Sequence, residues 1–199
     1  GNAGNMGDCL PIAERFYKNF KCNVVMLSYR GYGLSEGTPS EKGLRTDAQT
    51  VLNYISEHEV LKHTKLVIYG QSLGGAVSID LVSKNEDKVA GLIVENTFLS
   101  IPKLLPHVIP QLRHFSFFCT QKWESDKAMK LIKRVPVLFL CGAIDELIPT
   151  EHVMQLYEMT NTEGGKEFQS FPNGTHQDTV AQPGYFDVIE EFLLTKVVG

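Results

Sequence analysis

A serine hydroxyl in a strand–turn–helix setting is the first candidate for chemistry in this sequence. Ser72 lies in a Gly-x-Ser-x-Gly pattern at 70–74, after an apolar run at 65–70 and before a helix-like pattern. The glycines permit a turn too tight for a β-carbon and are expected to leave Ser72 strained and exposed at the strand end. The N–H of Leu73 would then point at the place where an oxyanion forms. This setting favours a nucleophile over a plain turn serine.

An acid and a base follow two later strand-like runs. Asp145 comes after the run at 135–142, and His176 after a weaker run at 166–172. Loops at the carboxyl ends of parallel strands meet at one edge of a sheet, so these side chains should lie near Ser72. His176 would take the serine proton as general base, and Asp145 would fix the imidazole tautomer. Glu146 is the rival acid, and Asp145 could instead cap the helix at 150–159; we favour Asp145 because it stands first after the strand.

Apolar runs typical of buried strands alternate with helical patterns along the chain. The runs predict strands at 22–30, 65–70, 89–97, 135–142 and 166–172. A helix that Thr38 would cap, with Pro39 at its first position, follows the first run. Further helices are predicted after Ser72, at 150–159 and at 184–196. Repeated βα units of this kind predict an α/β fold, with a mostly parallel sheet flanked by helices.

The composition limits the function classes. The 199 residues are 43% hydrophobic, which predicts one globular domain over residues 1–199. A formal net charge of −4 and a pI near 5.9 argue against a nucleic-acid partner. The sequence holds no apolar stretch of 18 residues, so it predicts no membrane span. The His, Cys, Asp and Glu residues show no metal-ligand spacing. We therefore expect no metal and no cofactor.

Residues 100–134 are the expected place of substrate selection. This segment lies between two predicted strands, where a lid is inserted in sheets of this type, and it is rich in proline and large apolar residues. One interpretation is an acyl-chain groove or membrane-facing surface. The other is a short cap helix whose apolar face packs on the sheet edge, and the sequence leaves both open. The residues expected to bind substrate are Leu105, Ile109, Phe117 and Phe118.

Six motifs together resemble one family, the bud-emergence (Bem-like) type of α/β-hydrolase, which includes membrane-anchored α/β-hydrolase domain-containing proteins. The likeness covers nearly the whole chain and is closest to fungal members. The motifs are GNAGN at 1–5, SYRGYGLSEG at 28–37, GQSLGG at 70–75, VENTFLS at 94–100, GAIDELIP at 142–149 and NGTHQDT at 173–179.

The resemblance implies an α/β-hydrolase fold with Ser72, Asp145 and His176 as the catalytic residues. It also implies that the backbone N–H of Asn2 is the second oxyanion donor. In such folds a central strand precedes this loop, so we expect an N-terminally incomplete domain whose N-terminal strands are missing. An upstream membrane anchor, with the endoplasmic reticulum as location, is a further implication, and the membrane would be reached through that segment.

The function that these residues predict is cleavage of a carboxylic ester or thioester through an acyl-enzyme. The resemblance implies a small-molecule or acylated-protein substrate and extends to removal of palmitoyl groups from protein cysteines. A carboxylesterase or lipid hydrolase is the enzymatic alternative, and a peptidase comes third. A non-catalytic scaffold in cell polarity is the alternative from another class, although a scaffold has no reason to keep all three triad positions.

Overall fold

The computed structural model describes residues 9–108 and 120–199. The chain divides into two compact units, one of residues 2–62 and the other of residues 63–199. The single domain over residues 1–199 stays a prediction. The lid-like insertion at 100–134 is described only in part, because residues 109–119 lie outside the described ranges.

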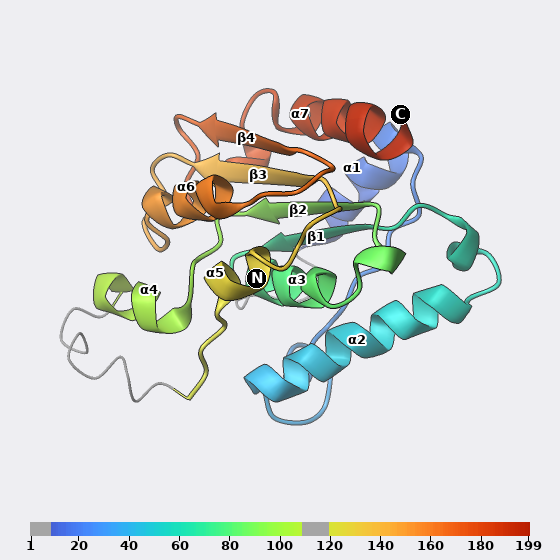
Figure 1. Ribbon diagram of the computed structural model, residues 1–199, viewed down its shortest axis with the longest axis horizontal. Coiled ribbons are helices and arrows are strands. Elements are labelled where there is room, and N and C mark those ends of the chain that lie inside the picture. Colours follow the sequence, from blue (N-terminus) through green and yellow to red (C-terminus); the bar gives the residue numbers. More distant parts are fainter. Residues whose placement is uncertain (1–8, 109–119) are drawn as a thin grey trace. The chain divides into compact units, whose positions relative to one another are not determined.

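A four-stranded parallel sheet forms the centre of the second unit (Figure 1). Its strands lie side by side in chain order and are β1 (Val67–Gln71), β2 (Gly91–Glu95), β3 (Val137–Gly142) and β4 (Lys166–Phe171). β2 and β3 are buried along their whole length, as expected of parallel strands covered on both faces. The predicted mostly parallel sheet flanked by helices is thereby confirmed. The predicted strand ends differ from these by at most two residues.

The two faces of the sheet follow from the alternation of side chains along each strand. Leu92 and Val94 of β2 belong to the main hydrophobic core, together with side chains of α3, α5 and α6. Glu95 lies on the opposite face, where it contacts Tyr185. These helices are α3 (Leu73–Ser83), α5 (Ser125–Met129), α6 (Thr150–Met159) and α7 (Tyr185–Phe192), of which α7 carries Tyr185 and continues as a π-helix, η6 (Leu193–Val198).

The remaining elements of this unit are short. They are α4 (Ile101–Val108) and three 3-10 turns, η2 (Leu61–His63), η3 (Glu86–Lys88) and η5 (Thr179–Ala181), with η2 at the boundary between the units. The helix predicted at 150–159 is confirmed as α6. The helix predicted at 184–196 covers α7 and most of η6, and α5 had no counterpart in the sequence-based prediction.

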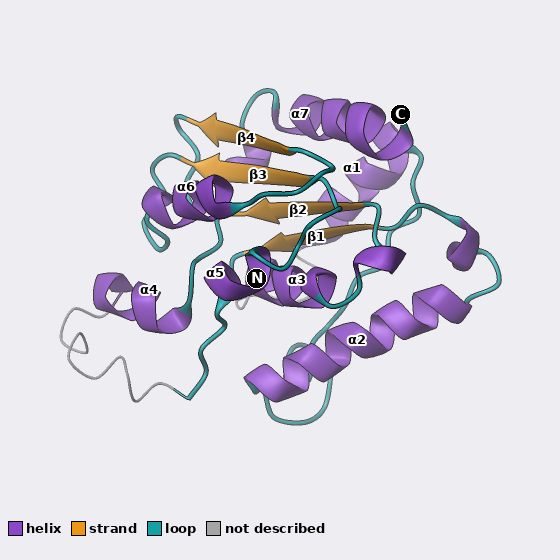
Figure 2. Ribbon diagram, viewed as in Figure 1, coloured by secondary structure: helices purple, strands orange, loops and turns teal. Residues whose placement is uncertain are grey.

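The first unit holds two helices, α1 (Leu10–Phe20) and α2 (Glu41–Glu57) (Figure 2). After α1 the chain runs through residues 21–30, which we call the extended segment. The prediction of a buried strand at 22–30 is wrong. Residues 21–29 have no regular secondary structure, and Val24 and Val25 are 41% and 46% exposed. A strand exists only where a neighbouring backbone completes its ladder, and no described strand pairs with this segment.

The start of α2 also differs from the sequence-based prediction. The cap is Ser40, not Thr38, and the helix begins at Glu41. Ser40 has an extended backbone, and its Oγ accepts the N–H of Gly43 at 3.1 Å. A serine two residues after the threonine offers the same hydroxyl, so the capping chemistry was right and its position was wrong.

Candidate active site

The turn between β1 and α3 has the strained geometry expected of a nucleophile elbow. Ser72 lies at φ 55° and ψ −121°, a conformation that a non-glycine residue rarely adopts. A β-carbon at Gly70 would lie 2.2 Å from the carbonyl oxygen of Gly74, and one at Gly75 would lie 2.5 Å from Thr97 Oγ1. The glycines are therefore required by close packing around the serine. The expectation of an exposed serine is wrong, because Ser72 is only 8% exposed.

Leu73 is the first residue of α3, and its N–H has no acceptor among the described residues. The first N–H groups of a helix have no partner within the helix, so this donor is free to bind an anion. The second predicted donor, Asn2, lies outside the described residues.

Asp145 and His176 form a buried hydrogen-bonded pair. Asp145 Oδ2 lies 2.8 Å from His176 Nδ1, and the two side chains are 1% and 4% exposed. The other carboxylate oxygen, Oδ1, accepts the N–H groups of Leu147 and Ile148, each at 2.8 Å. A carboxylate only accepts, so Nδ1 carries the proton and Nε2 is left as the basic nitrogen.

The geometry distinguishes Asp145 from its rival as the acid, Glu146. The exposed Glu146 accepts the backbone N–H of His176 at 3.2 Å, whereas Asp145 holds the ring. Asp145 does not cap α6, whose N-cap is Pro149. Glu146 thus steadies the histidine's backbone, and Asp145 is the residue positioned to orient its imidazole.

The histidine loop is joined to the serine elbow through side chains rather than through Ser72 itself. Among the described residues, no hydrogen bond links Ser72 Oγ to the His176 ring. Gln71, which precedes the serine, donates through Nε2 to the carbonyl oxygen of His176 at 2.9 Å. The sequence predicted no role for Gln71, because the motif leaves its position open.

Three further residues that sequence reasoning did not place at the site follow one another at the end of β2. Glu95, Asn96 and Thr97 are 0%, 1% and 0% exposed, and all three bond to the elbow or to the histidine loop. A Glu-Asn-Thr run that directly follows the apolar residues 91–94 of β2 is a signal that could have found them, since buried polar groups need partners.

Glu95 is the buried carboxyl beneath the site. Its Oε2 accepts the hydroxyls of Tyr69 at 2.6 Å and Tyr185 at 2.5 Å, and its Oε1 accepts the amide of Gln71 at 3.4 Å. Burial raises the pKa of Glu95, and the tyrosine hydrogen bonds act in the opposite direction.

Another buried histidine, His152 in α6, binds the turn that follows β2. Its Nδ1 accepts the N–H of Leu99 at 3.2 Å, and its ring meets the His107 ring edge-on at 5.6 Å. Burial lowers the pKa of His152 to about 4, with a smaller contribution from His107 in the same direction. His152 is therefore a neutral acceptor.

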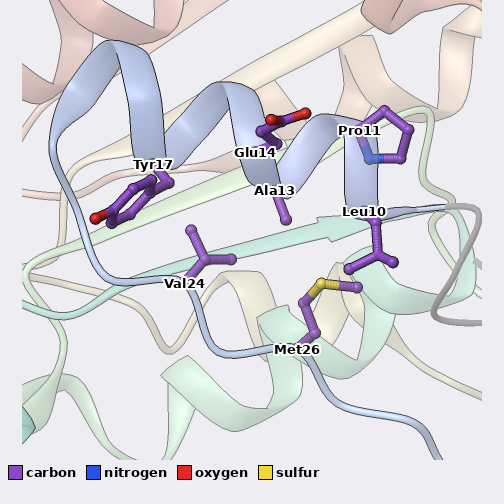
Figure 3. Close-up of a pocket in the computed structure, with 7 residues that line it drawn as sticks. All are labelled: Leu10, Pro11, Ala13, Glu14, Tyr17, Val24 and Met26. Atoms are coloured by element: carbon purple, nitrogen blue, oxygen red, sulfur yellow. The ribbon is translucent and has the colours of Figure 1, made fainter.

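The residues predicted to bind substrate remain largely untested. Leu105 lies on α4 and is half-buried, while Ile109, Phe117 and Phe118 lie outside the described residues. The hollow drawn in Figure 3 belongs to the first unit and contains none of the triad residues. Side chains of α1 and of the extended segment line it, among them Leu10, Tyr17, Val24 and Met26.

Within residues 9–108 and 120–199, no group of three or more His, Cys, Asp or Glu side chains is arranged to hold a metal ion. None of the helices in those ranges combines the length and apolar character needed to cross a membrane.

The comparisons with known sequences all point to one family. A family model described as the alpha/beta hydrolase fold matches residues 1–116. The chain is 49% identical over 193 residues to Protein bem46 of Schizosaccharomyces pombe, covering 96% of this chain and 64% of that protein. It is 45% identical over 196 residues to the "Uncharacterized membrane protein YNL320W" of Saccharomyces cerevisiae, covering 98% and 69%. The chain thus spans about two thirds of the length of these relatives.

Comparison with solved structures agrees on the fold. An esterase from Pyrococcus furiosus superposes with a TM-score of 0.74 at 19% identity, covering 94% of this chain and 75% of the esterase. At that identity the likeness concerns the fold alone.

Proposed function

Because this chain belongs to the Bem46 family of α/β-hydrolases, we propose that it is a serine hydrolase acting through a Ser72-Asp145-His176 triad. The observation that carries the proposal is the buried pair of Asp145 and His176, 2.8 Å apart, next to a serine held at positive φ. Gln71 connects the two parts by its bond to the carbonyl of His176. A buried acid–histidine pair beside a strained serine is the arrangement that nucleophilic acyl transfer requires.

The proposed reaction has two halves. His176 Nε2 takes the proton of Ser72 Oγ while Oγ attacks the carbonyl carbon of the substrate, and the Leu73 N–H stabilises the oxyanion. The tetrahedral intermediate collapses when the bond to the alcohol or thiol breaks and the leaving group receives the proton from His176. Water then attacks the acyl-enzyme with His176 again as base, which releases a carboxylic acid and restores Ser72. Asn2 is the proposed second donor to the oxyanion.

The proposed substrates are carboxylic esters or thioesters, including palmitoyl thioesters of protein cysteines. Leu105, Ile109, Phe117 and Phe118 are proposed to contact the acyl chain. The yeast relative's name contains the words "membrane protein", which supports the proposal that the whole protein is attached to a membrane. We propose the endoplasmic reticulum as that membrane.

A fluorophosphonate probe tests the nucleophile, because only an activated serine displaces fluoride from its phosphorus. We expect the full protein to be labelled, Ser72→Ala to abolish labelling, and kcat for a 4-nitrophenyl ester to fall about 10³- to 10⁶-fold. Ser83→Ala, at the far end of α3, is the matched control and should keep full labelling. Labelling that survives Ser72→Ala would refute the assignment, and a folded protein that never labels would favour the scaffold.

A matched pair of substrates tests the bond that is cleaved. The same acyl group is offered as an oxygen ester and as a thioester, with chain lengths from two to sixteen carbons. A higher kcat/KM for long-chain thioesters supports depalmitoylation, and a preference for short esters would point to a carboxylesterase instead. Leu105→Ser should raise KM for long chains without changing the value for acetate esters if Leu105 contacts the chain.

A further inference from the structure

The turn that follows β2 places three consecutive buried polar residues, Glu95, Asn96 and Thr97, at the centre of the candidate site. All are at most 1% exposed. Every fully buried side-chain nitrogen or oxygen of the described residues has a hydrogen-bond partner, and this includes the polar groups of these three side chains. Such complete pairing in a low-dielectric interior fixes the geometry of the segments that it joins.

Asn96 joins the acid strand to the histidine loop. Its Oδ1 accepts the N–H of Gly142 at 2.8 Å, at the end of the strand that leads to Asp145. Its Nδ2 donates to Thr179 Oγ1 at 3.0 Å and lies 3.3 and 3.4 Å from the carbonyl oxygens of Thr175 and His176. One amide therefore spans the two loops that present Asp145 and His176.

The backbone of Asn96 is adapted to this position. Its φ is +44°, in the left-handed region where asparagine is among the few side chains that are tolerated. This conformation follows a strand whose residues are fully extended, so it turns the chain sharply at the strand end. The strained backbone and the side-chain amide together favour asparagine at this place.

The neighbours of Asn96 hold the serine elbow. The Glu95 carbonyl accepts the N–H of Ser72 at 2.9 Å, and Thr97 Oγ1 donates to the Ser72 carbonyl at 2.8 Å. Both backbone groups of the serine are thus bound to residues that flank Asn96. The three segments that carry Ser72, Asp145 and His176 all converge on this one turn.

We propose that Asn96 is a positioning residue that holds the His176 loop against the end of β3, the strand that leads to Asp145. The imidazole of His176 thereby keeps its position relative to the serine elbow. The inference rests on the proposed function for its catalytic consequence. The structural part of the inference is that the His176 ring keeps a fixed orientation on Asp145. This orientation can be measured without any turnover.

The test uses two substitutions of Asn96 in the full protein. Asn96→Asp keeps the shape and the acceptor for Gly142 but removes the donors to the histidine loop. Asn96→Gly suits the positive φ and removes every side-chain bond. We expect kcat for a 4-nitrophenyl ester to fall about 10- to 100-fold in both, with KM changed less than about threefold, because misplacement of a catalytic group acts on the chemical step.

Asn85→Asp is the matched control. Asn85 is also a buried asparagine, 8% exposed, and its amide donates to the Leu81 carbonyl at the other end of α3. A loss of stability without loss of kcat in this variant separates general damage from positioning. Melting temperature and circular dichroism verify that each variant is folded.

A low-field proton resonance of the His176 Nδ1–H, identified by its absence in Asp145→Asn, provides the readout that does not depend on catalysis. We expect it to shift or broaden in folded Asn96→Asp and Asn96→Gly and to persist in Asn85→Asp. Folded Asn96 variants with an unchanged resonance and unchanged kcat would overturn the inference. If Ser72→Ala keeps its activity, the proposed function fails, while the resonance still decides whether Asn96 positions His176.

Discussion

Two apolar runs of similar composition adopt different structures in this molecule. The run that includes β2 forms a strand whose residues are completely buried and paired on both edges. The run at 22–30 lies in the extended segment, which pairs with no described strand and in which Val25 is nearly half exposed. Both carry the hydrophobic residues that a parallel strand needs. The difference shows that hydrophobic residues alone are not sufficient for a strand, because a strand also requires backbone partners.

The two segments also end differently. β2 runs into the fully paired turn Glu95-Asn96-Thr97, and four residues beyond the strand the Leu99 N–H is held by His152. The extended segment ends at Arg30, whose guanidinium and backbone N–H bind the carboxylate of Asp47. The contact at the end of each segment includes an ionisable side chain, His152 after β2 and Asp47 at Arg30. We call these contacts the anchors of the two segments. The comparison can therefore be tested by substitution within the segments and by pH at the anchors.

The largest contrast is expected from one charge placed in each segment. Val94→Asp would bury a carboxylate at a position that is 0% exposed, at a cost above about 4 kcal/mol in the free energy of unfolding. Val25→Asp, at 46% exposed, should cost at most about 0.5 kcal/mol. Urea unfolding followed by circular dichroism measures both.

If Val94→Asp does not fold, alanine provides a milder version of the same comparison. Val94→Ala should cost about 2 kcal/mol, since it removes buried methyl groups from a packed core, and Val25→Ala should cost a small fraction of that. Equal losses at the two positions would mean that the extended segment is as fully packed as the strand.

The sequence predicted the parts of the site whose chemistry is local. The Gly-x-Ser-x-Gly pattern between strand and helix indicated the elbow, and β1 and α3 surround it as expected. Asp145 and His176 were chosen because each follows a strand, and the structure brings them within hydrogen-bonding distance. Whether they catalyse stays a prediction.

The parts that could not be predicted depend on distant partners. Asn96 bonds to residues 46 and 83 positions away, and no local pattern specifies such pairs. The wrong strand at 22–30 has the same origin, because the partner of a strand is not encoded within the strand. The shift of the helix cap from Thr38 to Ser40 is a smaller error, within the usual uncertainty of helix ends.

A smaller effect is expected from acid at the turn after β2. The pKa of His152 is lowered to about 4 in the folded protein from about 6.5 when unfolded. Between these values the unfolded chain binds a proton that the folded protein refuses, so stability falls as the pH drops from 6.5 to 4 and this contribution then levels off. The loss is about 3 kcal/mol.

His152→Asn removes the titrating group and keeps an acceptor for the Leu99 N–H. Its unfolding free energy should therefore depend much less on pH between 6.5 and 4 than that of the unsubstituted protein. A variant with the same pH dependence as the parent would show that His152 is not the group responsible. His58→Asn, at the end of α2, is the control for substitution of a histidine elsewhere.

The smallest effect is expected at the anchor of the extended segment, in a separate pH range. Hydrogen bonds from Arg30 lower the pKa of Asp47 below its usual 3.8. The carboxylate therefore stabilises the folded state at neutral pH, and this contribution is lost as the pH falls below 3.8 towards the lower folded value. Asp47→Asn should cost about 1 kcal/mol at pH 7 and remove this acid-dependent loss, since the pair is partly exposed to solvent.

Asp87→Asn, at an exposed carboxylate in η3, is the matched control and should leave the acid transition unchanged. Acid titration of unfolding free energy in the single variants and in His152→Asn/Asp47→Asn then separates the two anchors. The two losses begin at different pH values, near 6.5 for His152 and near 3.8 for Asp47, and the double variant should lose both contributions. If Asp47→Asn instead changed the range between 6.5 and 4, the anchors would be coupled and the extended segment would not be held independently of the turn after β2.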